Sequence, residues 1–354
     1  MTLKAVIIAD DLTGALDTGT PFVEAGLSVS VAVDVEAAQD AVATGCDVVV
    51  VNTASRAIGE REAAERVRHA TGALRGAKPD IVMKKIDSRL KGNVAAESLA
   101  LAEVLGLETI LVAPAIPDQE RVTYRGCVVG RGVDGPLPIA DLFKGRAGNV
   151  AVADAEDDMD LDQIVADHDW RLTLAVGARG LGAALARRLG EEERQPMPEF
   201  AATPGTLFAF GSRDPITIAQ MDRLEASGVL RMVVDAPMGE IEGGEGMALP
   251  ALLRCSGDMA ADATLVAHRF AAGVKTVIDD TGPDMLMLGG GDTALAVFHA
   301  LGVRVLAPKG EIEAGVPWFD VTAADGRHFR CAVKSGGFGK PDSLLRLVRW
   351  NRAA

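Results

Sequence analysis

Four cations and one carboxylate crowd into the ten residues Lys84 to Asn93 of a chain whose formal net charge is −14. A dense positive cluster on a negative background is typical of a site that holds an anion, although most charge runs are solvated surface. The residues just before it, Asp80 to Met83, read as the end of a short apolar strand. The cluster therefore lies where a strand passes into a helix, which is where open α/β sheets bind ligands.

Two adjacent carboxylates follow the first apolar run of the chain, Ala5 to Ala9. Asp10 and Asp11 stand between this predicted strand and a helical pattern, where a carboxylate can orient hydroxyl groups or accept a proton. The structural alternative is that Asp11 caps the helix and Asp10 is solvated. Polar residues from Asn52 to Arg56 follow the third predicted strand, and in a parallel sheet they would lie at the same edge.

Three turns rich in glycine and hydroxyl groups follow predicted strands in the second half of the chain. Glycine lets a backbone approach a ligand closely, and a helix N-terminus offers unpaired N–H groups to an anion. One such turn alone is usually an ordinary connection, but three together indicate a phosphate or nucleotide site. They match neither the P-loop pattern nor GxGxxG. The turns are Phe210 to Asp214, Gly289 to Thr293 and Lys334 to Gly339.

The elements that must position these residues alternate along the whole chain. Short β-branched runs separated by helical patterns predict an α/β fold of two α/β domains, each with a largely parallel sheet flanked by helices. The charged, proline-containing stretch from Glu191 to Gly205 predicts the linker, which gives domains at 1–195 and 196–354. We expect strands at 5–9, 28–33, 47–52, 81–84, 109–113, 172–176, 206–210, 231–235, 285–288, 303–306 and 330–333, and helices at 15–25, 60–74, 94–105, 181–189 and 341–350.

Length and composition exclude several classes of protein. A chain of 354 residues with 48% hydrophobic and 24% charged residues is globular and long enough for two domains. Its pI near 4.9 argues against a nucleic acid or an anionic membrane as partner. The sequence shows no membrane-spanning or signal-peptide pattern, so we expect a cytoplasmic protein. Four isolated cysteines and five scattered histidines suggest neither a disulfide framework nor a metal site.

Taken together, these stretches resemble the four-carbon acid sugar kinase family, once catalogued as a domain of unknown function. The matching residues occur in the family's order and span nearly the whole chain. The charged ten-residue cluster and the C-terminal SGxFG stretch are the distinctive parts. The resemblance rests on residues 9–15, 84–93, 211–212, 290–293, 315–318 and 334–342.

This resemblance implies an N-terminal domain that binds a small sugar acid, a C-terminal domain that binds ATP, and an active site in the cleft between them. The reaction would transfer the γ-phosphoryl group to the terminal hydroxyl of a four-carbon acid such as D-threonate, D-erythronate or a 3-oxo-tetronate. Carried over by motif, the contacts to ATP would come from Ser212, Gly290, Gly291, Asp292, Thr293 and Gly336.

The demands of the reaction suggest further roles. Phosphoryl transfer is mostly positioning and charge stabilisation, so we expect Mg²⁺ to bridge the ATP phosphates. Asp292 is a candidate to hold it, with a helix cap or a ribose contact as alternatives, and no metal ligand is assigned. Arg89 is the first choice for the acid's carboxylate because a guanidinium offers paired donors, and Asp10 or Asp11 would act as base or positioner. We expect the other contacts to the acid from Lys84, Lys85, Asp87 and Asn52.

Two features differ from the family's usual pattern. Asp214 stands where members often have a second serine, and residues 121–143 replace a threonine-rich segment that would shape the pocket. The identity of the acid therefore stays open. Three rival functions remain: a sensor that binds without turnover, a dehydrogenase, and a phosphohydrolase that uses Asp10 and Asp11. The missing GxGxxG counts against the second, and the missing DxD spacing counts against the third. A homodimer is compatible with the sequence.

Overall fold

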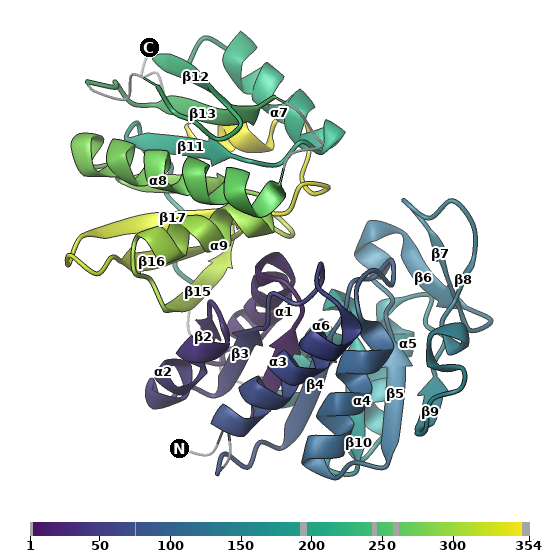
Figure 1. The fold of residues 1–354 in the computed structure, drawn as a ribbon. Helices are drawn as coiled ribbons and strands as arrows, with labels where there is room; N and C mark the ends of the chain where they lie inside the picture. The colour runs from purple at the N-terminus through teal and green to yellow at the C-terminus, as the bar shows by residue number, and fades with distance from the viewer. Residues whose placement is uncertain (1–2, 75, 192–196, 243–245, 258–261, 349–354) are drawn as a thin grey trace. The chain divides into compact units, whose positions relative to one another are not determined.

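The computed structural model describes residues 3–74, 76–191, 197–242, 246–257 and 262–348, and the chain divides into two compact units, residues 1–196 and 197–354. Both units are α/β, as the sequence predicts (Figure 1). The predicted boundary between residues 195 and 196 lies in the segment 192–196, outside the described residues. We describe each unit by itself.

The N-terminal unit is built on a parallel sheet with the strand order β2-β3-β1-β4-β10-β5-β9. Strands β1 and β3 are fully buried runs of small and β-branched residues, and both faces of the sheet are covered. Each buried valine or isoleucine side chain contributes about 1.5–3 kcal/mol. The strands are β1 (Ala5–Ala9), β2 (Val29–Ala32), β3 (Val48–Asn52), β4 (Ile81–Lys85), β5 (Thr109–Ala113), β9 (Asn149–Val152) and β10 (Thr173–Gly177).

The helices of this unit form two groups (Figure 1). One group packs α1 (Leu12–Glu24) and α5 (Asp158–Asp167) against α6 (Arg179–Leu189), and the other packs α2 (Ala38–Ala43) and α4 (Val94–Leu105) against α3 (Glu60–Ala73). Strand β9, helix α5 and a small antiparallel sheet were not predicted. That small sheet consists of β6 (Arg121–Tyr124), β7 (Cys127–Gly130) and β8 (Leu137–Pro138).

The C-terminal unit has the strand order β12-β13-β11-β14-β17-β16-β15, and β16 pairs antiparallel with both of its neighbours, β15 and β17. Helix α8 (Ala263–Thr281) packs on α9 (Gly291–Ala300), while α7 (Pro215–Ala226) contacts a short 3₁₀ turn, η4 (Ser343–Leu347). The strands are β11 (Thr206–Phe210), β12 (Met232–Pro237), β13 (Ala251–Ser256), β14 (Met285–Gly289), β15 (Val305–Glu311), β16 (Pro317–Thr322) and β17 (His328–Lys334).

Two predictions for this unit differ from the structure. The helix expected at 341–350 is only the 3₁₀ turn η4 in the described residues, and residues 349–354 lie outside them. Strand β13 and helix α8 were not assigned, although buried Phe270, Val274 and Val277 mark a helical face on α8. Within the described residues, no helix is long and apolar enough to cross a membrane.

Each sheet has a point where the direction of strand addition reverses. In the N-terminal unit β1 lies between β3 and β4, so the chain extends the sheet on one side of β1 first and then on the other. In the C-terminal unit β11 lies between β13 and β14 in the same way. Ligands of open α/β sheets bind outside the carboxyl ends of strands at such points. The carboxyl ends of β1 and β4, and of β11 and β14, are therefore the places to look for sites.

Candidate functional site

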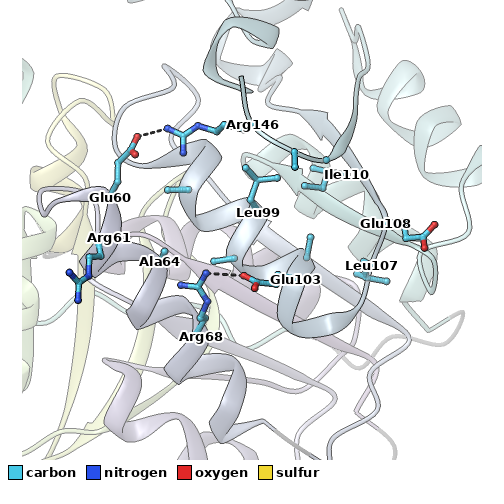
Figure 2. A pocket seen from close by; sticks show the side chains of 15 residues that line it. Glu60, Arg61, Ala64, Arg68, Leu99, Glu103, Leu107, Glu108, Ile110 and Arg146 are labelled. Atoms are coloured by element: carbon cyan, nitrogen blue, oxygen red, sulfur yellow. Dashed lines mark hydrogen bonds and ion pairs between the residues drawn. The ribbon is translucent and has the colours of Figure 1, made fainter. Parts of the chain in front are cut away.

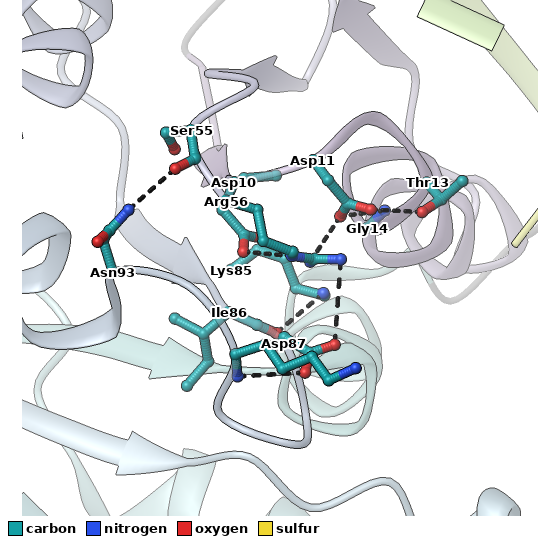
Figure 3. A network of polar contacts seen from close by, with 12 residues as sticks. Asp10, Asp11, Thr13, Gly14, Ser55, Arg56, Lys85, Ile86, Asp87 and Asn93 are labelled. Atoms are coloured by element: carbon teal, nitrogen blue, oxygen red, sulfur yellow. Dashed lines mark hydrogen bonds and ion pairs between the residues drawn. The ribbon is translucent and has the colours of Figure 1, made fainter. Parts of the chain in front are cut away.

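Arg56 ties together the turns at the carboxyl ends of β1 and β4 (Figure 3). Its Nε and Nη2 donate to the two carboxylate oxygens of Asp10 at 2.7 and 2.8 Å, and Nη2 also donates to Oδ1 of Asp11 at 2.8 Å. Its Nη1 lies 4.0 Å from Oδ1 of Asp87. Burial acts to lower the pKa of Arg56, but the three carboxylates outweigh it and raise that pKa above its usual range. The guanidinium is thus permanently charged at the centre of the cluster.

Asp10 is buried. The structural alternative, in which Asp10 is a solvated neighbour of the helix cap, is therefore wrong. Burial acts to raise its pKa, but the hydrogen bonds and charge of Arg56, with the charges of Lys84 and Lys85, hold the pKa of Asp10 below its usual range. Its backbone carbonyl accepts from the amides of Ser55 and Arg56 at 2.9 and 3.2 Å. Asp10 therefore fixes the turn after β3 as well as the guanidinium.

Asp11 does cap α1, as the structural alternative proposed. Its Oδ1 accepts from the amide of Gly14 at 2.9 Å, and its Oδ2 accepts from the hydroxyl of Thr13 at 2.6 Å. Its side chain is 19% exposed, whereas that of Asp10 is 4% exposed. Of the two carboxylates, Asp11 is the one that a ligand can reach.

The two lysines of the predicted cluster have different surroundings. Successive residues of a strand point to opposite faces. Lys84 and Glu97 form an ion pair at 2.7 Å with both side chains 1% exposed. The Nζ of Lys85 donates to the carbonyl of Ile86 at 2.9 Å, and a Cβ atom at Gly14 would lie 2.8 Å from it. Lys85 thus lies beside the start of α1, while Lys84 is enclosed with a buried carboxylate.

Asn52, Asp87 and Arg89 also differ in what they contact. Asn52 is fully buried, and its amide donates to the carbonyl of Val33 at 2.8 Å and accepts from the amide of Ala54 at 2.9 Å. Oδ2 of Asp87 accepts from the amides of Arg89 and Lys91 at 3.1 and 3.3 Å, which shapes the turn after β4. The guanidinium of Arg89 is exposed and makes no hydrogen bond or ion pair with the part of the chain that the structure describes.

Sequence reasoning missed Arg56 as the centre of this cluster, although it noted the polar turn that contains it. The signal was present in the strand pattern. Parallel strands β1 and β3 pair with Ala9 opposite Asn52, so the residues that follow each strand emerge side by side. Arg56 comes four residues after the end of β3, and Asp10 and Asp11 come directly after β1. These oppositely charged groups therefore lie at the same edge of the sheet.

The three glycine turns of the C-terminal unit come together at the ends of β11, β14 and β17. The amides of Gly211 and Ser212 donate to the carbonyl of Gly289 at 3.1 and 3.3 Å, and the amide of Gly290 donates to that of Lys334 at 2.9 Å. The turns also fit closely against each other's side chains. A Cβ atom at Gly211 would lie 2.0 Å from Oγ1 of Thr293, and one at Gly336 would lie 2.6 Å from Oγ of Ser212.

Two helices begin at this cluster. Helix α9 starts at Gly291 after Gly290, whose φ of 100° suits glycine, and no side chain caps it, so neither Asp292 nor Thr293 is the cap. Helix α7 is capped by Asp214, whose Oδ1 accepts from the amide of Ile216 at 2.9 Å. The carboxylate that departs from the family pattern therefore has a structural role at this position.

Lys334 organises the third glycine turn and was not singled out from the sequence. Its fully buried Nζ donates to Oγ1 of Thr217 at 2.9 Å and to the carbonyls of Ser335, Gly336 and Phe338 at 3.0, 3.3 and 2.9 Å. Burial lowers the pKa of Lys334 to about 8, while the charges of Asp214 and Glu313 act to raise it. One ammonium group thus holds the backbone of the turn in place.

A separate hollow of about 850 Å³ lies between α3, α4 and the segment around Arg146 (Figure 2). Its floor is aliphatic, and two of its rim cations are paired, Arg146 with Glu60 at 2.7 Å and Arg68 with Glu103 at 2.8 Å. None of the residues of the two clusters above lines it. We therefore give it no part in the chemistry.

Both units thus carry polar clusters where open α/β sheets bind ligands. Comparison with known proteins shows which family the chain resembles. A family model described as a sugar-binding N-terminal domain matches residues 5–141, and one described as a nucleotide-binding C-terminal domain matches residues 247–344. The D-threonate kinase of Cupriavidus necator is 30% identical over 96% of this chain and 96% of its own length. The 3-oxo-tetronate kinase of Pseudomonas fluorescens is 26% identical over 96% of this chain and 95% of its own length.

Solved structures show the same fold. A crystal structure from Salmonella typhimurium LT2 aligns with a TM-score of 0.76 at 20% identity and covers 98% of this chain and 99% of its own. A Haemophilus influenzae protein aligns with a TM-score of 0.66 at 21% identity and covers 97% and 98%. The chain belongs to the four-carbon acid sugar kinase family.

Proposed function

We propose that this protein is an ATP-dependent kinase that phosphorylates the terminal hydroxyl of a four-carbon sugar acid. Relatives named D-threonate kinase and 3-oxo-tetronate kinase match over nearly the full chain. The observation that carries the proposal is the cluster around Arg56, in which Asp10 and Asp11 are held beside cations at the carboxyl ends of β1 and β4. Such a cluster can bind an anionic acid and orient its hydroxyl groups.

Asp11 is our choice for the group that orients the attacking hydroxyl and accepts its proton. Both oxygens of Asp10 already accept from Arg56, and a carboxylate held in this way is a poor proton acceptor. Asp11 is more exposed, and its Oδ2 accepts only from the hydroxyl of Thr13 among the described residues. Asp10 is then a positioning residue that acts through Arg56.

Lys85 and Arg89 are our choices for the cations that bind the acid. Lys85 lies next to Asp11 and the start of α1, and Arg89 is exposed on the turn that Asp87 shapes. The contacts of Lys84 and Asn52 favour structural roles for these two residues, because both are enclosed by buried partners. Asp87 then supports Arg89 through the backbone of the turn and Arg56 through its charge.

Mg-ATP is the second substrate in this proposal. The glycine turns with Ser212, Gly336 and the segment from Gly290 to Thr293 would receive its phosphates, because the start of α9 presents backbone N–H groups without a side-chain cap. Mg²⁺ reduces the charge on the transferring phosphoryl group. In the described residues no group of three or more metal-binding side chains occurs, so the phosphates themselves would supply most of the ligands, with Asp292 a candidate for one contact.

The decisive experiment is coupled ADP release with Mg-ATP and a panel of D- and L-threonate, D- and L-erythronate and their 3-oxo relatives. We expect acid-dependent turnover with at least one of them. Binding of ATP and an acid without turnover would instead support a sensor. Release of phosphate from a phosphorylated acid in the absence of ATP would support a phosphohydrolase.

A further inference from the structure

We propose that Arg121, the first residue of β6, joins Arg89 in binding the carboxylate of the acid and so sets the specificity of the site for acids. This inference rests on the proposed function, since it names a further residue of the same acid site. Arg121 lies within residues 5–141, the part of the chain that the sugar-binding domain model matches.

The side chain of Arg121 is fixed against the turn after β4. Its Nη1 donates to the hydroxyl of Ser88 at 2.5 Å, and its Nε and Nη2 donate to the carbonyl of Arg131 at 3.1 and 2.9 Å. Ser88 is the residue immediately before Arg89 and is buried. A guanidinium held in one orientation loses little further entropy when it binds a carboxylate.

Arg89 and Arg121 both lie close to Gly132. A Cβ atom at Gly132 would lie 3.5 Å from Nη2 of Arg121 and 4.0 Å from both Cδ and Nη1 of Arg89. The φ of Gly132 is +76°, so this position favours glycine, and Gly132 itself adds no side chain beside the two arginines. We place the carboxylate of the acid beside Gly132, where both guanidinium groups would donate to it.

The charges that act on Arg121 are mostly positive. Burial and the charges of Arg89 and Arg131 lower the pKa of Arg121, and only the charge of Asp87 acts against them. Asp87 is already engaged, because its Oδ2 accepts from two backbone amides and its Oδ1 faces Arg56. The arrangement therefore leaves positive charge that an anionic ligand would compensate.

Asp87 also relates this pair to the proposed base. Its side chain faces Arg56, which contacts Asp11 (Figure 3). The turn that Asp87 shapes also carries Arg89. In this proposal the carboxylate of the acid lies beside Arg89 and Arg121, and its far hydroxyl points toward Asp11.

The test compares Arg121→Met with Arg125→Met, a matched loss of one arginine from the same hairpin. The guanidinium of Arg125 lies 5.1 Å from the ring centroid of the exposed Tyr124 and makes none of the contacts above. Both variants and the parent are assayed with the best acid of the panel and with erythritol and threitol, which keep the hydroxyls but lack the carboxylate. Binding of each acid without ATP is measured by calorimetry.

We expect Arg121→Met to lower kcat/KM for the acid and to weaken its binding by about 10- to 100-fold, as loss of a charge-assisted hydrogen bond does. Its use of the tetritols and its KM for ATP would stay near those of the parent. Arg125→Met should change none of these. Ser88→Ala, which removes one of the contacts that orient Arg121, should weaken acid binding by a smaller factor. Arg121→Lys should recover part of the loss.

Equal losses for the acid and the tetritols, or equal effects of Arg121→Met and Arg125→Met, would overturn the inference and leave Arg121 a structural anchor of the hairpin. If the parent binds an acid but releases no ADP, the kinase proposal fails while the calorimetric comparison still tests Arg121. If the parent binds no acid of the panel, both proposals are overturned.

Discussion

The two sheets of this protein carry their clusters at equivalent places, but one cluster consists of charged side chains and the other of glycine turns. At the ends of β1 and β4, charged side chains meet one another, with Arg56 between three carboxylates. At the ends of β11 and β14, glycine turns lie against the hydroxyl groups of Ser212 and Thr293. The first edge is suited to recognise a small ligand by charge, and the second to let phosphates approach the backbone.

This difference has a consequence for how each edge can be damaged. At the charged edge, removing one charge leaves its partners unpaired while the backbone is little changed. At the glycine edge, adding a single carbon atom displaces the backbone or its neighbours. The predictions below use this contrast, and their expected effects decrease in order.

Asp11→Asn should have the largest effect, because it removes the proposed proton acceptor while asparagine still caps α1. We expect kcat to fall by about 10²- to 10⁴-fold with the melting temperature nearly unchanged. Steady-state ADP release and thermal denaturation measure the two quantities. A variant with parental kcat would rule out Asp11 as the base and move that role to Asp10.

Lys84→Met should lower the free energy of unfolding by about 3–5 kcal/mol, because it leaves Glu97 buried without its partner. Urea denaturation gives this value, and the double variant Lys84→Met/Glu97→Gln should recover much of it. Lys85→Met is the matched comparison at the neighbouring position on β4. It should weaken acid binding with less effect on stability, and the opposite outcome would reverse the roles of the two lysines.

The pH dependence of stability should reveal Lys334. Its pKa of about 8 in the folded state is below its ordinary value of 10.5, so between these pH values the unfolded chain holds a proton that the folded chain has released. The free energy of unfolding should therefore rise with pH across this window, by at most roughly 3 kcal/mol, relative to Lys334→Met. Urea titrations of both proteins from pH 7 to 11 measure it. Parallel curves would mean that the four acceptors around Nζ keep the pKa near its ordinary value.

Gly211→Ala should weaken ATP binding by about tenfold or more, since overpacking of this kind costs about 1–3 kcal/mol. The new methyl group would overlap Oγ1 of Thr293, whereas at Gly337 it would meet only Oδ2 of Asp214 at 3.7 Å. Gly337→Ala is therefore the control. Calorimetry with ATP and, separately, with the acid should show a loss confined to ATP, and equal losses for both ligands would indicate a general loss of folding.

The strands and turns that depend on short-range sequence patterns were predicted from the sequence. The buried runs of β1, β3 and β11 are continuous enough to be read as strands, and the glycine turns after β11 and β14 follow from them. The separation of Lys84 from Lys85 follows from strand periodicity, but only if the strand is continued through Lys85. The prediction ended this strand at Lys84 and counted both lysines in one cation cluster.

Other features depend on contacts between distant residues. Glu97 looks like a solvent-facing residue of α4 until Lys84 from β4 is placed beneath it. The short strands β6, β7 and β8 are only half-buried, so their hydrophobic alternation is weak, and Arg121 could not be placed near Ser88 from pattern alone. Lys334 was visible as part of a turn, but its four acceptors come from that turn and from α7.

The position of β10 in the N-terminal sheet affects the order in which the sheet can form during synthesis. This strand is the last of the sheet in sequence, yet it lies between β4 and β5, and the carbonyl of Gly177 accepts from the amide of Ile86 at 2.9 Å at the start of the charged turn. During synthesis at about 5–20 residues per second, β4 and β5 leave the ribosome many residues before their shared neighbour. The position between β4 and β5 can therefore be filled only after β10 has been made, and the hydrogen bond at the start of the charged turn can form only then.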